Sequence, residues 1–273
     1  MTLEVLIPAR NPTGVFRQTI ESLAAQTDKN FSVLVSDNFS TQGMDEFDHA
    51  LKTLAAAGIA ARKIRPPQEL GRVEHWNWLH QQSEADWLKP LFAGDWLESS
   101  YMERLRETVR ATPSCQYVFS NGYTHRPGEQ PWTAENLWTG KFNSPAEMQK
   151  VVLSFGMQFG PPSAAAYARK AFVLAGGYDP KLPICADSYL FCKMAALFGA
   201  AGMSDRLFHF QIHGARFSHD LRGKRWEPFR ESMIYYFKLL HDVRAAGGHV
   251  PVVGFLRLLA RACRGYLFPK RDA

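Results

Sequence analysis

The sequence contains few cysteines and no long hydrophobic run. Its four cysteines, Cys115, Cys185, Cys192 and Cys263, are scattered and form no C-x-x-C pair. This argues against a disulfide scaffold or a cysteine zinc site and favours free thiols in a cytoplasmic protein. No apolar stretch reaches roughly 18 residues, and no basic segment with an apolar core opens the chain. We therefore expect neither a transmembrane helix nor a secretion signal.

The composition indicates an ordinary globular protein without internal repeats or low-complexity segments. The chain has 273 residues, of which 46% are hydrophobic, enough for one large domain with a substantial core. The net charge is +6 and the pI about 9.2. This mild basicity suits nucleotide phosphates, anionic lipid or nucleic acid and does not distinguish among them.

The first part of the chain alternates strand-like and helix-like patterns. Expected strands cover residues 3–8, 31–36, 59–65 and 87–92, and expected helices cover 16–26, 45–57 and 73–83. Such spacing predicts β-α-β units, and hence an α/β fold with a mainly parallel sheet flanked by helices.

Later segments of the chain are less regular. A further helix is expected over 101–112 and a strand over 116–120, whereas residues 121–150 resemble a long surface excursion. The second half is expected to be rich in helices, most clearly over 186–198.

Two carboxylates follow apolar strands of the expected sheet. Asp37 ends the run from Phe31, and Asp95 follows the run from Trp87. Because ligands of open α/β sheets bind at the carboxyl ends of the strands, this pair suggests a nucleotide and a metal. The simpler alternative is that each carboxylate caps the helix that follows it.

The loop after the first strand has the sequence Pro8-Ala9-Arg10-Asn11. Such a loop can close over a base or ribose, and Arg10 can bind a phosphate through two hydrogen bonds. Proline and asparagine also favour plain turns, so an ordinary β-α turn is the alternative.

The order of these features resembles the opening of the family 2 glycosyltransferases, which have the GT-A fold. Residues 5–41, VLIPARNPTGVFRQTIESLAAQTDKNFSVLVSDNFST, share a proline-containing loop, a helix ending in Gln26 and a strand ending in Asp37. Residues 71–105, GRVEHWNWLHQQSEADWLKPLFAGDWLESSYMERL, resemble the segment that carries the D-x-D motif of the family. The resemblance implies a GT-A fold and nucleotide-sugar binding.

The resemblance also assigns residues near the expected D-x-D motif. The triplet here is Ala93-Gly94-Asp95, so the first acid is missing. Asp95 is implied as the direct ligand of Mn²⁺ or Mg²⁺, which would hold the donor diphosphate. Arg72 and Asn77 are implied to lie near the nucleotide-sugar.

A second resemblance covers residues 175–195, AGGYDPKLPICADSYLFCKMA, where the family has an acidic pair that opens a helix. Ala186 replaces the first acid, and Asp187 corresponds to the general base of the family. A helix cap is the alternative role for Asp187. Further on, His213 is implied as a metal or diphosphate ligand, with a surface or packed histidine as the alternative.

The expected domain organisation is a GT-A domain over 1–220 and a helical C-terminal extension over 221–273. Within the domain, residues 1–120 form the nucleotide-binding half and 121–220 the acceptor half. Residues 251–273 contain five basic residues and one acid, and their spacing predicts a basic amphipathic helix. This helix either binds an anionic membrane surface, where a lipid-linked acceptor would lie, or packs on the domain.

The resemblance as a whole implies an inverting glycosyltransferase that uses a nucleotide-sugar, expected to be a UDP-sugar, with Mn²⁺ or Mg²⁺. We expect it to act on a glycan or lipid-linked glycan in bacterial surface polysaccharide assembly, as a cytoplasmic protein or at the inner face of the membrane. The alternatives are a nucleotide-sugar-binding protein that has lost catalysis and a nucleotidyltransferase. Nucleic acid is not an expected partner, because the positive charge is concentrated in the tail.

Overall fold

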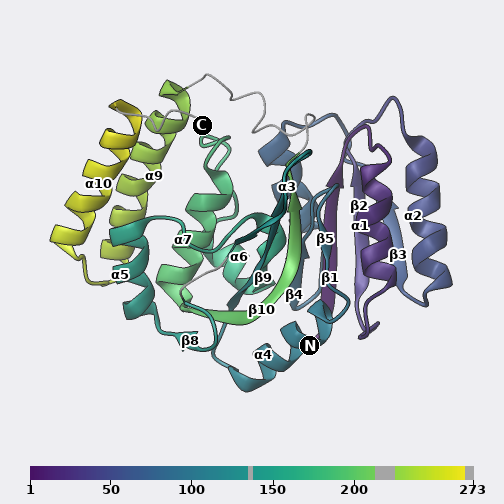
Figure 1. Ribbon diagram of the computed structural model, residues 1–273, viewed down its shortest axis with the longest axis horizontal. Helices are drawn as coiled ribbons and strands as arrows, with labels where there is room; N and C mark the ends of the chain where they lie inside the picture. Colours follow the sequence, from purple (N-terminus) through teal and green to yellow (C-terminus); the bar gives the residue numbers. More distant parts are fainter. Residues whose placement is uncertain (135–137, 213–224, 268–273) are drawn as a thin grey trace.

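A computed structural model describes residues 1–134, 138–212 and 225–267. At its centre, described strands form a sheet in the order β3-β2-β1-β4-β9-β6-β10-β5, with β7 paired to β6 and β8 to β10 (Figure 1). The strands are β1 (Leu3–Ala9), β2 (Ser32–Asp37), β3 (Ala60–Ile64), β4 (Trp87–Pro90), β5 (Trp96–Leu97), β6 (Tyr117–His125), β7 (Trp132–Ala134), β8 (Phe142–Asn143), β9 (Ala165–Ala168) and β10 (Ala200–Gln211).

Helices flank the sheet, and two further helices follow it at the C-terminal end of the described chain. They are α1 (Val15–Ala24), α2 (Met44–Ala56), α3 (Arg72–Gln81), α4 (Tyr101–Ala111), α5 (Pro145–Phe155), α6 (Arg169–Ala175), α7 (Ala186–Phe198), α9 (Trp226–Ala245) and α10 (Val252–Leu267), with a 3₁₀ turn over Pro162–Ala164. In Figure 1, α2 and α10 lie at opposite ends of the molecule. No helix within the described ranges is both long enough and apolar enough to cross a membrane.

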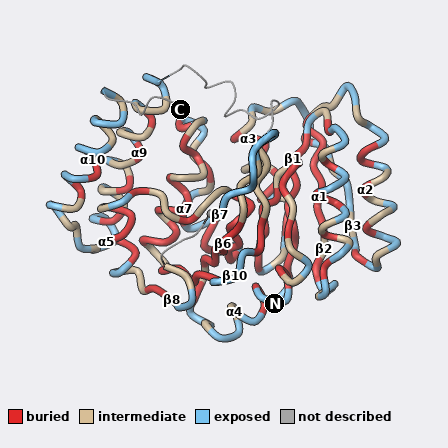
Figure 2. Tube along the Cα trace, viewed as in Figure 1, coloured by how far each residue is buried: buried red, intermediate tan, exposed pale blue. Residues whose placement is uncertain are grey.

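The N-terminal part of the sheet, β1 to β4, has the parallel arrangement that the sequence predicts. Strand β1 pairs in parallel with β2 and β4, and β2 pairs in parallel with β3. Strand β1 is buried along nearly its whole length, as expected for a parallel strand covered on both faces, and Figure 2 shows the central strands as the buried part of the molecule. The predicted α/β class, with mostly parallel strands flanked by helices, is confirmed.

The later strands β6 and β10 are joined to β1–β4 through one antiparallel strand. Strand β9 pairs antiparallel with both β4 and β6, and β10 pairs in parallel with β6. Two reversals restore the original direction, so β6 and β10 run parallel to β1. The carboxyl ends of β1, β2, β4, β6 and β10 therefore face the same edge of the sheet.

The prediction of a long surface excursion over 121–150 is wrong for most of that segment. Strand β6 continues to His125, β7 and β8 follow, and α5 begins at Pro145. Ser144 and Glu147 cap α5 reciprocally, an S-x-x-E signal that was present in the sequence. Strands β7 and β8 have three and two residues, too short to show the alternation that identifies a strand.

Candidate functional site

The loops after β1 and β2 are joined by one asparagine. The Asn11 backbone N–H donates to Ser40 Oγ at 2.8 Å. Asn11 Oδ1 accepts from the backbone N–H groups of Thr41 at 2.8 Å and Gln42 at 3.3 Å. Asn11 has φ +48°, a left-handed conformation that asparagine tolerates better than most residues. The prediction of a loop from Pro8 is wrong at its start, because Pro8 and Ala9 are the last residues of β1. Arg10 and Asn11 follow the strand and are held against the end of β2.

A second asparagine ties the end of β2 to the loop before α3. Asn38 Nδ2 donates to the Leu70 carbonyl at 2.8 Å, and Asn38 Oδ1 accepts from the Leu70 N–H at 3.0 Å. Arg10 and Glu69 form an ion pair of 2.7 Å between half-exposed side chains. Three loops, after β1, β2 and β3, thus form one continuous edge. The role of Asn38 went unrecognised in the sequence, although it directly follows Asp37.

Asp37 is fully buried beneath these loops. Its Oδ1 accepts from the Ser40 N–H at 2.8 Å, and its Oδ2 accepts from Arg65, whose Nε lies at 3.2 Å. Burial alone would raise the pKa of Asp37, but the hydrogen bonds from Arg65 and Ser40 outweigh it and lower that pKa. Asp37 therefore orders the loop that starts at Asn38, and both of its oxygens already accept hydrogen bonds.

Because the folded-state pKa of Asp37 is lowered, Asp37 should stabilise the folded protein at pH values above the ordinary aspartate pKa. As the pH falls from about 4 through the folded-state pKa, this contribution should be lost, because protons then bind the unfolded chain first. We expect the stability of the wild type to fall over this range more steeply than that of Asp37→Asn. Urea unfolding at a series of acidic pH values measures this difference, and parallel curves would contradict it.

The first turn of α3 meets the first turn of α7. Arg72 donates a hydrogen bond to the carbonyl of Pro183, and its guanidinium lies 5.0 Å from the centre of the Trp76 ring. Burial lowers the pKa of Arg72, while the charges of Asp187 and Glu231 raise it. Arg72 and Asp187, predicted separately from distant segments, therefore lie in one electrostatic neighbourhood beside the loop edge.

Asp187 is half-buried in the first turn of α7. Its Oδ1 accepts from the N–H of Ser188 at 2.7 Å, and the N-cap position of the helix is Cys185, which makes no side-chain cap. Burial raises the pKa of Asp187 despite the opposing effects of the Ser188 hydrogen bond and the Arg72 charge. A carboxylate with a raised pKa is a better proton acceptor, as a general base requires.

The C-terminal extension holds the segment that carries Asp187. Glu231 of α9, itself buried, accepts hydrogen bonds from the N–H groups of Ile184 at 2.8 Å and Cys185 at 3.1 Å. Lys238 of the same helix pairs with Asp179 at 2.5 Å. Neither residue could be predicted from the sequence, because a carboxylate and an amine in an amphipathic helix resemble solvated surface residues. The predicted boundary between 220 and 221 lies outside the described residues.

Asn77 connects α3 to the Gly-Gly-Tyr turn. Its Nδ2 donates to the Tyr178 carbonyl at 2.7 Å, and its Oδ1 accepts from the Tyr178 N–H at 2.9 Å. Gly177 has φ +70°, and a Cβ there would lie 2.7 Å from Asn77 Oδ1. Both ends of the predicted donor-binding amide are therefore engaged by the backbone of this turn.

Asp95 lies deeper than the three loops, in a polar network between β4 and β10. Ser163 Oγ donates to Asp95 Oδ2, and the Gln211 N–H donates to Oδ1 at 3.2 Å. The neighbouring Gly94 has φ +95° and donates its N–H to Thr19 Oγ1 at 2.9 Å. Neither the side chain of Asp95 nor that of Ser163 is exposed.

A buried lysine completes this network. Lys89 Nζ donates to the carbonyls of Ser163 and Ala165, the latter at 3.1 Å. Burial lowers the pKa of Lys89 strongly, against the attraction of Asp95. Lys89 interrupts an otherwise apolar strand, a signal that the sequence analysis passed over.

The described residues do not form a preformed metal cage. They include no group of three or more His, Cys, Asp or Glu side chains that could hold an ion. Asp95 is a single, fully buried carboxylate with hydrogen bonds to both oxygens. The other predicted ligand, His213, lies outside the described residues. We therefore derive no catalytic step through a metal.

Comparison with known proteins supports this reading of the fold. The model of the family "Glycosyl transferase family 2" matches residues 4–174, whereas no curated protein sequence matches the chain. The structure of S. aureus TarS 1-349 in complex with UDP-GlcNAc is similar, with a TM-score of 0.71 at 11% identity, covering 98% of this chain and 73% of that one.

Two further solved structures show the same fold. TarS 1-349 in complex with UDP has a TM-score of 0.69 at 12% identity, with coverage of 100% and 74%. The mannosyltransferase PcManGT from Pyrobaculum calidifontis, in complex with GDP-Man and Mn²⁺, has a TM-score of 0.61 at 15% identity, with coverage of 98% and 70%. The family match spans more than half of the chain and includes the loop edge. The chain therefore belongs to glycosyl transferase family 2 and is a glycosyltransferase with the GT-A fold.

Proposed function

We propose that this glycosyltransferase moves a sugar from a UDP-sugar to an acceptor hydroxyl with inversion at the anomeric carbon. The observation that carries the proposal is the position of Asp187. This carboxylate has a raised pKa and lies beside Arg72, next to the loop edge on which a nucleotide would bind. The loops, the arginine and the base together supply what an in-line displacement requires.

The proposed reaction is one displacement. The acceptor oxygen forms a bond to the anomeric carbon, and the bond from that carbon to the donor diphosphate breaks with its electron pair moving to the phosphate oxygen. The proton of the acceptor hydroxyl passes to the Asp187 carboxylate. Arg10 and Arg72 bind the phosphates, and the rigid loops hold donor and acceptor in reacting geometry.

The remaining predicted residues have supporting roles in this proposal. Asp37 and Asn11 shape the loops that receive the nucleoside. Asn77 acts indirectly, because its amide fixes the Gly-Gly-Tyr turn that leads to Asp187. A uridine donor is supported by the fold similarity to TarS, which is solved with UDP and with UDP-GlcNAc.

A divalent cation, Mn²⁺ or Mg²⁺, is proposed to bind together with the nucleotide instead of before it. The described residues contain no cage, and such ions take many of their ligands from phosphate and water. When bound, the ion would offset the charge of the departing diphosphate. Asp95 is the one described carboxylate proposed to approach it.

Thermal unfolding with UDP and Mn²⁺, each alone and combined, tests the donor proposal. We expect UDP alone to stabilise the protein and Mn²⁺ alone to have no effect. UDP and Mn²⁺ together should stabilise the protein more than UDP alone. For scale, a ligand at a hundredfold excess over its Kd stabilises by about 2.7 kcal/mol. GDP serves as the control nucleotide. Equal shifts with GDP would contradict a uridine donor, and stabilisation by Mn²⁺ alone would contradict joint binding.

The second candidate function is nucleotide-sugar binding without catalysis, because Ala93 and Ala186 replace two motif acids. A nucleotide-sugar-binding protein of this kind would show the UDP shift but no turnover. Donor hydrolysis by the wild type distinguishes the two functions.

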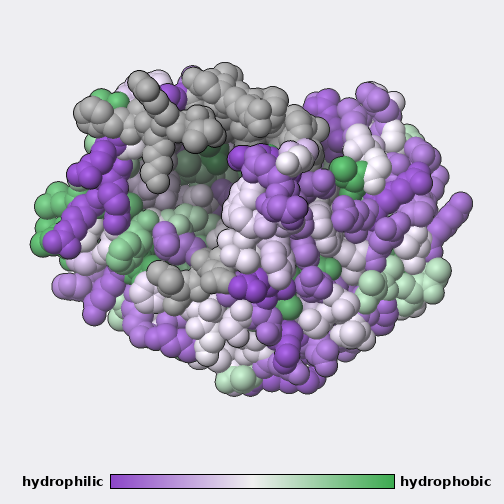
Figure 3. Space-filling model, viewed as in Figure 1, coloured by the Kyte–Doolittle hydropathy of each residue, from purple (hydrophilic) through white to green (hydrophobic). Residues whose placement is uncertain are grey.

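The acceptor is proposed to be a glycan carried on lipid at an anionic membrane surface, as in bacterial surface polysaccharide assembly. Helix α10 packs on the protein through Phe255 and Leu258, but it leaves Val252, Val253 and Leu256 about three-fifths exposed, at 59–62%. Arg257 and Arg264 of the same helix are exposed, whereas Arg261 donates to the carbonyl of Ser154. Figure 3 shows hydrophobic and hydrophilic atoms side by side where α10 lies. The packed-tail alternative thus explains only one face of the helix.

Vesicle sedimentation tests the membrane proposal. We expect the protein to bind vesicles containing anionic phospholipid more strongly than phosphatidylcholine vesicles, and Leu256→Glu to weaken this binding about tenfold through loss of apolar burial. The matched control is Leu174→Glu, at a residue of α6 that is 68% exposed. Equal losses in both variants would contradict a specific role for α10.

A further inference from the structure

Three polar side chains form a hydrogen-bonded chain on the acceptor side of the sheet. Glu98 follows β5, His209 lies in β10, and His125 is the last residue of β6. His209 Nε2 lies 2.7 Å from Glu98 Oε1, and His209 Nδ1 lies 2.8 Å from His125 Nε2. The chain thus runs from Glu98 through His209 to His125.

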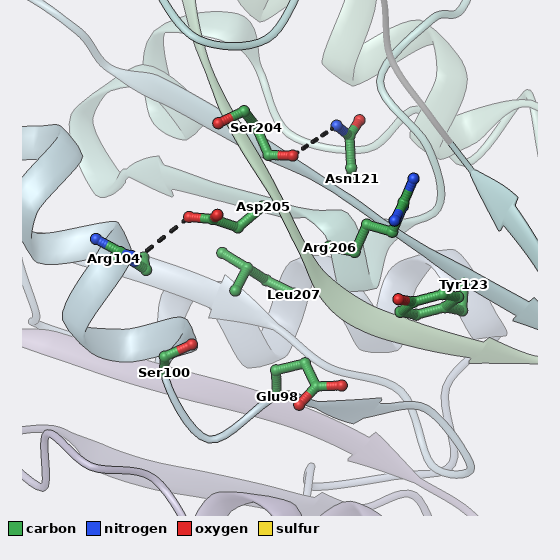
Figure 4. A pocket seen from close by; sticks show the side chains of 9 residues that line it. All are labelled: Glu98, Ser100, Arg104, Asn121, Tyr123, Ser204, Asp205, Arg206 and Leu207. Carbon is green, nitrogen blue, oxygen red and sulfur yellow. Dashed lines mark hydrogen bonds and ion pairs between the residues drawn. The ribbon is translucent and has the colours of Figure 1, made fainter.

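Aromatic rings fix the central imidazole. The Trp96 ring stacks on His209 with a centroid separation of 4.7 Å and an angle of 6°, and Tyr123 stacks on it at 5.0 Å and 20°. The Trp96 ring also lies 4.7 Å from that of His125. Figure 4 shows Glu98 and Tyr123 lining a neighbouring polar cavity of about 670 Å³.

The chemistry of the chain sets the direction of each hydrogen bond. A carboxylate only accepts, so a His209 ring that carries one proton holds it on Nε2, toward Glu98. His209 Nδ1 then has a lone pair and accepts from Nε2–H of His125. This leaves His125 Nδ1 as a bare acceptor. Burial lowers the pKa of His125, which favours the neutral ring.

The outer nitrogen has no partner among the described residues. Among the side-chain atoms of His125, Nε2 alone forms a hydrogen bond to those residues. Nδ1 is not one of the fully buried polar atoms that lack a partner. A structural role in joining β5 to β10 needs only Glu98 and His209. The extension to His125 therefore ends in an accessible hydrogen-bond acceptor.

The position of His125 in the sheet places its Nδ1 relative to the loops after β1, β2 and β3. His125 pairs with Gln211 in the parallel register of β6 and β10, and the Gln211 N–H donates to Asp95. Because β6 runs parallel to β1, His125 lies at the same sheet edge as the nucleotide-binding loops. It lies on the side away from β2 and β3.

We propose that His125 is an acceptor-binding residue, whose Nδ1 accepts a hydrogen bond from a hydroxyl of the acceptor glycan. Glu98 and His209 are positioning residues that fix its tautomer. This inference rests on the proposed function, since it names the ligand of the acceptor side of that same site. It assigns no proton transfer to His125, because that role belongs to Asp187.

The tautomer tests the inference without knowledge of the natural acceptor. Long-range nitrogen–hydrogen correlation spectra of histidine-labelled protein near neutral pH should show His125 protonated at Nε2 and bare at Nδ1. In Glu98→Gln the His125 tautomer should become mixed, whereas Glu107→Gln, at an exposed residue of α4, should leave it unchanged. A His125 protonated at Nδ1, or a tautomer indifferent to Glu98→Gln, would overturn the proposal.

Ligand binding is tested with methyl β-glucoside and methyl α-mannoside as hydroxyl probes, in the presence of UDP. We expect at least one probe to move the His125 Nδ1 resonance, and its affinity to fall about fivefold to tenfold in His125→Gln. His125→Asn, which keeps an acceptor near the Nδ1 position, should retain more affinity than His125→Gln. His241→Gln, at a side chain that is 81% exposed, is the control.

The outcomes of this titration separate the two proposals. The acceptor role is refuted if neither probe moves the Nδ1 resonance. It is also refuted if His125→Gln and His125→Asn bind the probe with equal affinity. A protein that shows no UDP shift would instead refute the proposed function, whatever the histidine spectra show.

Discussion

Asp187→Asn is expected to lower the rate of sugar transfer and of donor hydrolysis by at least about a hundredfold. Removing a general base typically costs a factor of 10² to 10⁴, and the amide cannot take the proton of the acceptor hydroxyl. The amide retains an oxygen that can accept from the Ser188 N–H. The variant therefore removes the base while preserving the local hydrogen bond.

This choice of substitution also decides between the two roles considered for Asp187. Asparagine serves helix starts as well as aspartate does, so a purely structural residue would tolerate the change. Asp205→Asn, at a half-exposed surface carboxylate paired with Arg104, is the matched control. In the wild type, the raised pKa of Asp187 should place the acidic limb of kcat/KM above the range of an ordinary aspartate. Equal turnover in Asp187→Asn and the wild type would remove Asp187 from the mechanism.

Asp95→Ala is expected to produce the largest loss of stability among the site variants. It leaves Ser163 Oγ and the Gln211 N–H buried without an acceptor, and each such group costs about 1–3 kcal/mol. It also removes the charge that faces buried Lys89. We expect a loss of about 3 kcal/mol or more, which lowers Tm by roughly 6–12 °C in a protein of this size.

The double variant Asp95→Ala with Lys89→Met distinguishes a charge effect from simple loss of packing. If the uncompensated lysine contributes to the loss, the second substitution should recover part of the Tm. Asp205→Ala is the surface control. An unchanged Tm in Asp95→Ala, with the joint effect of UDP and Mn²⁺ abolished, would show instead that Asp95 is an exposed ligand.

The N-terminal part of the sheet, β1 to β4, could be predicted from the sequence because its signals are local. Buried parallel strands are continuous apolar runs, and residues such as Asp37 mark where they end. The loop edge then follows from topology, since parallel strands deliver their carboxyl ends to the same side. The mutual hydrogen bonds of Asn11 and Asn38 depend on loops far apart in sequence, and a single residue carries no sign of such pairing.

The later part of the sheet, β5 to β10, was less predictable because its strands are short or irregular. Strand β9 consists of three alanines and a tyrosine, and alanine is depleted in strands. Strand β10 contains register shifts between Met203 and Phe208. These breaks interrupt the alternation on which strand prediction depends. The chain from Glu98 to His125 consequently could not be seen before the strands were placed.

The role of Glu231 in the C-terminal helices could not be predicted from the sequence either. Glu231 stabilises the turn before Asp187 from a segment that the sequence assigns to an appendage. Its spacing within α9 is that of any charged residue on a surface helix. Only the packing of α9 on α7 gives it a role in the site.

A crystal structure of the protein with UDP and Mn²⁺ tests the central claim most directly. The claim predicts the uracil and ribose against the loops after β1 and β2, and the diphosphate between Arg10, Arg72 and the end of β4, facing Asp187. A nucleotide bound elsewhere on the protein, with Asp187 turned away from it, would contradict the account.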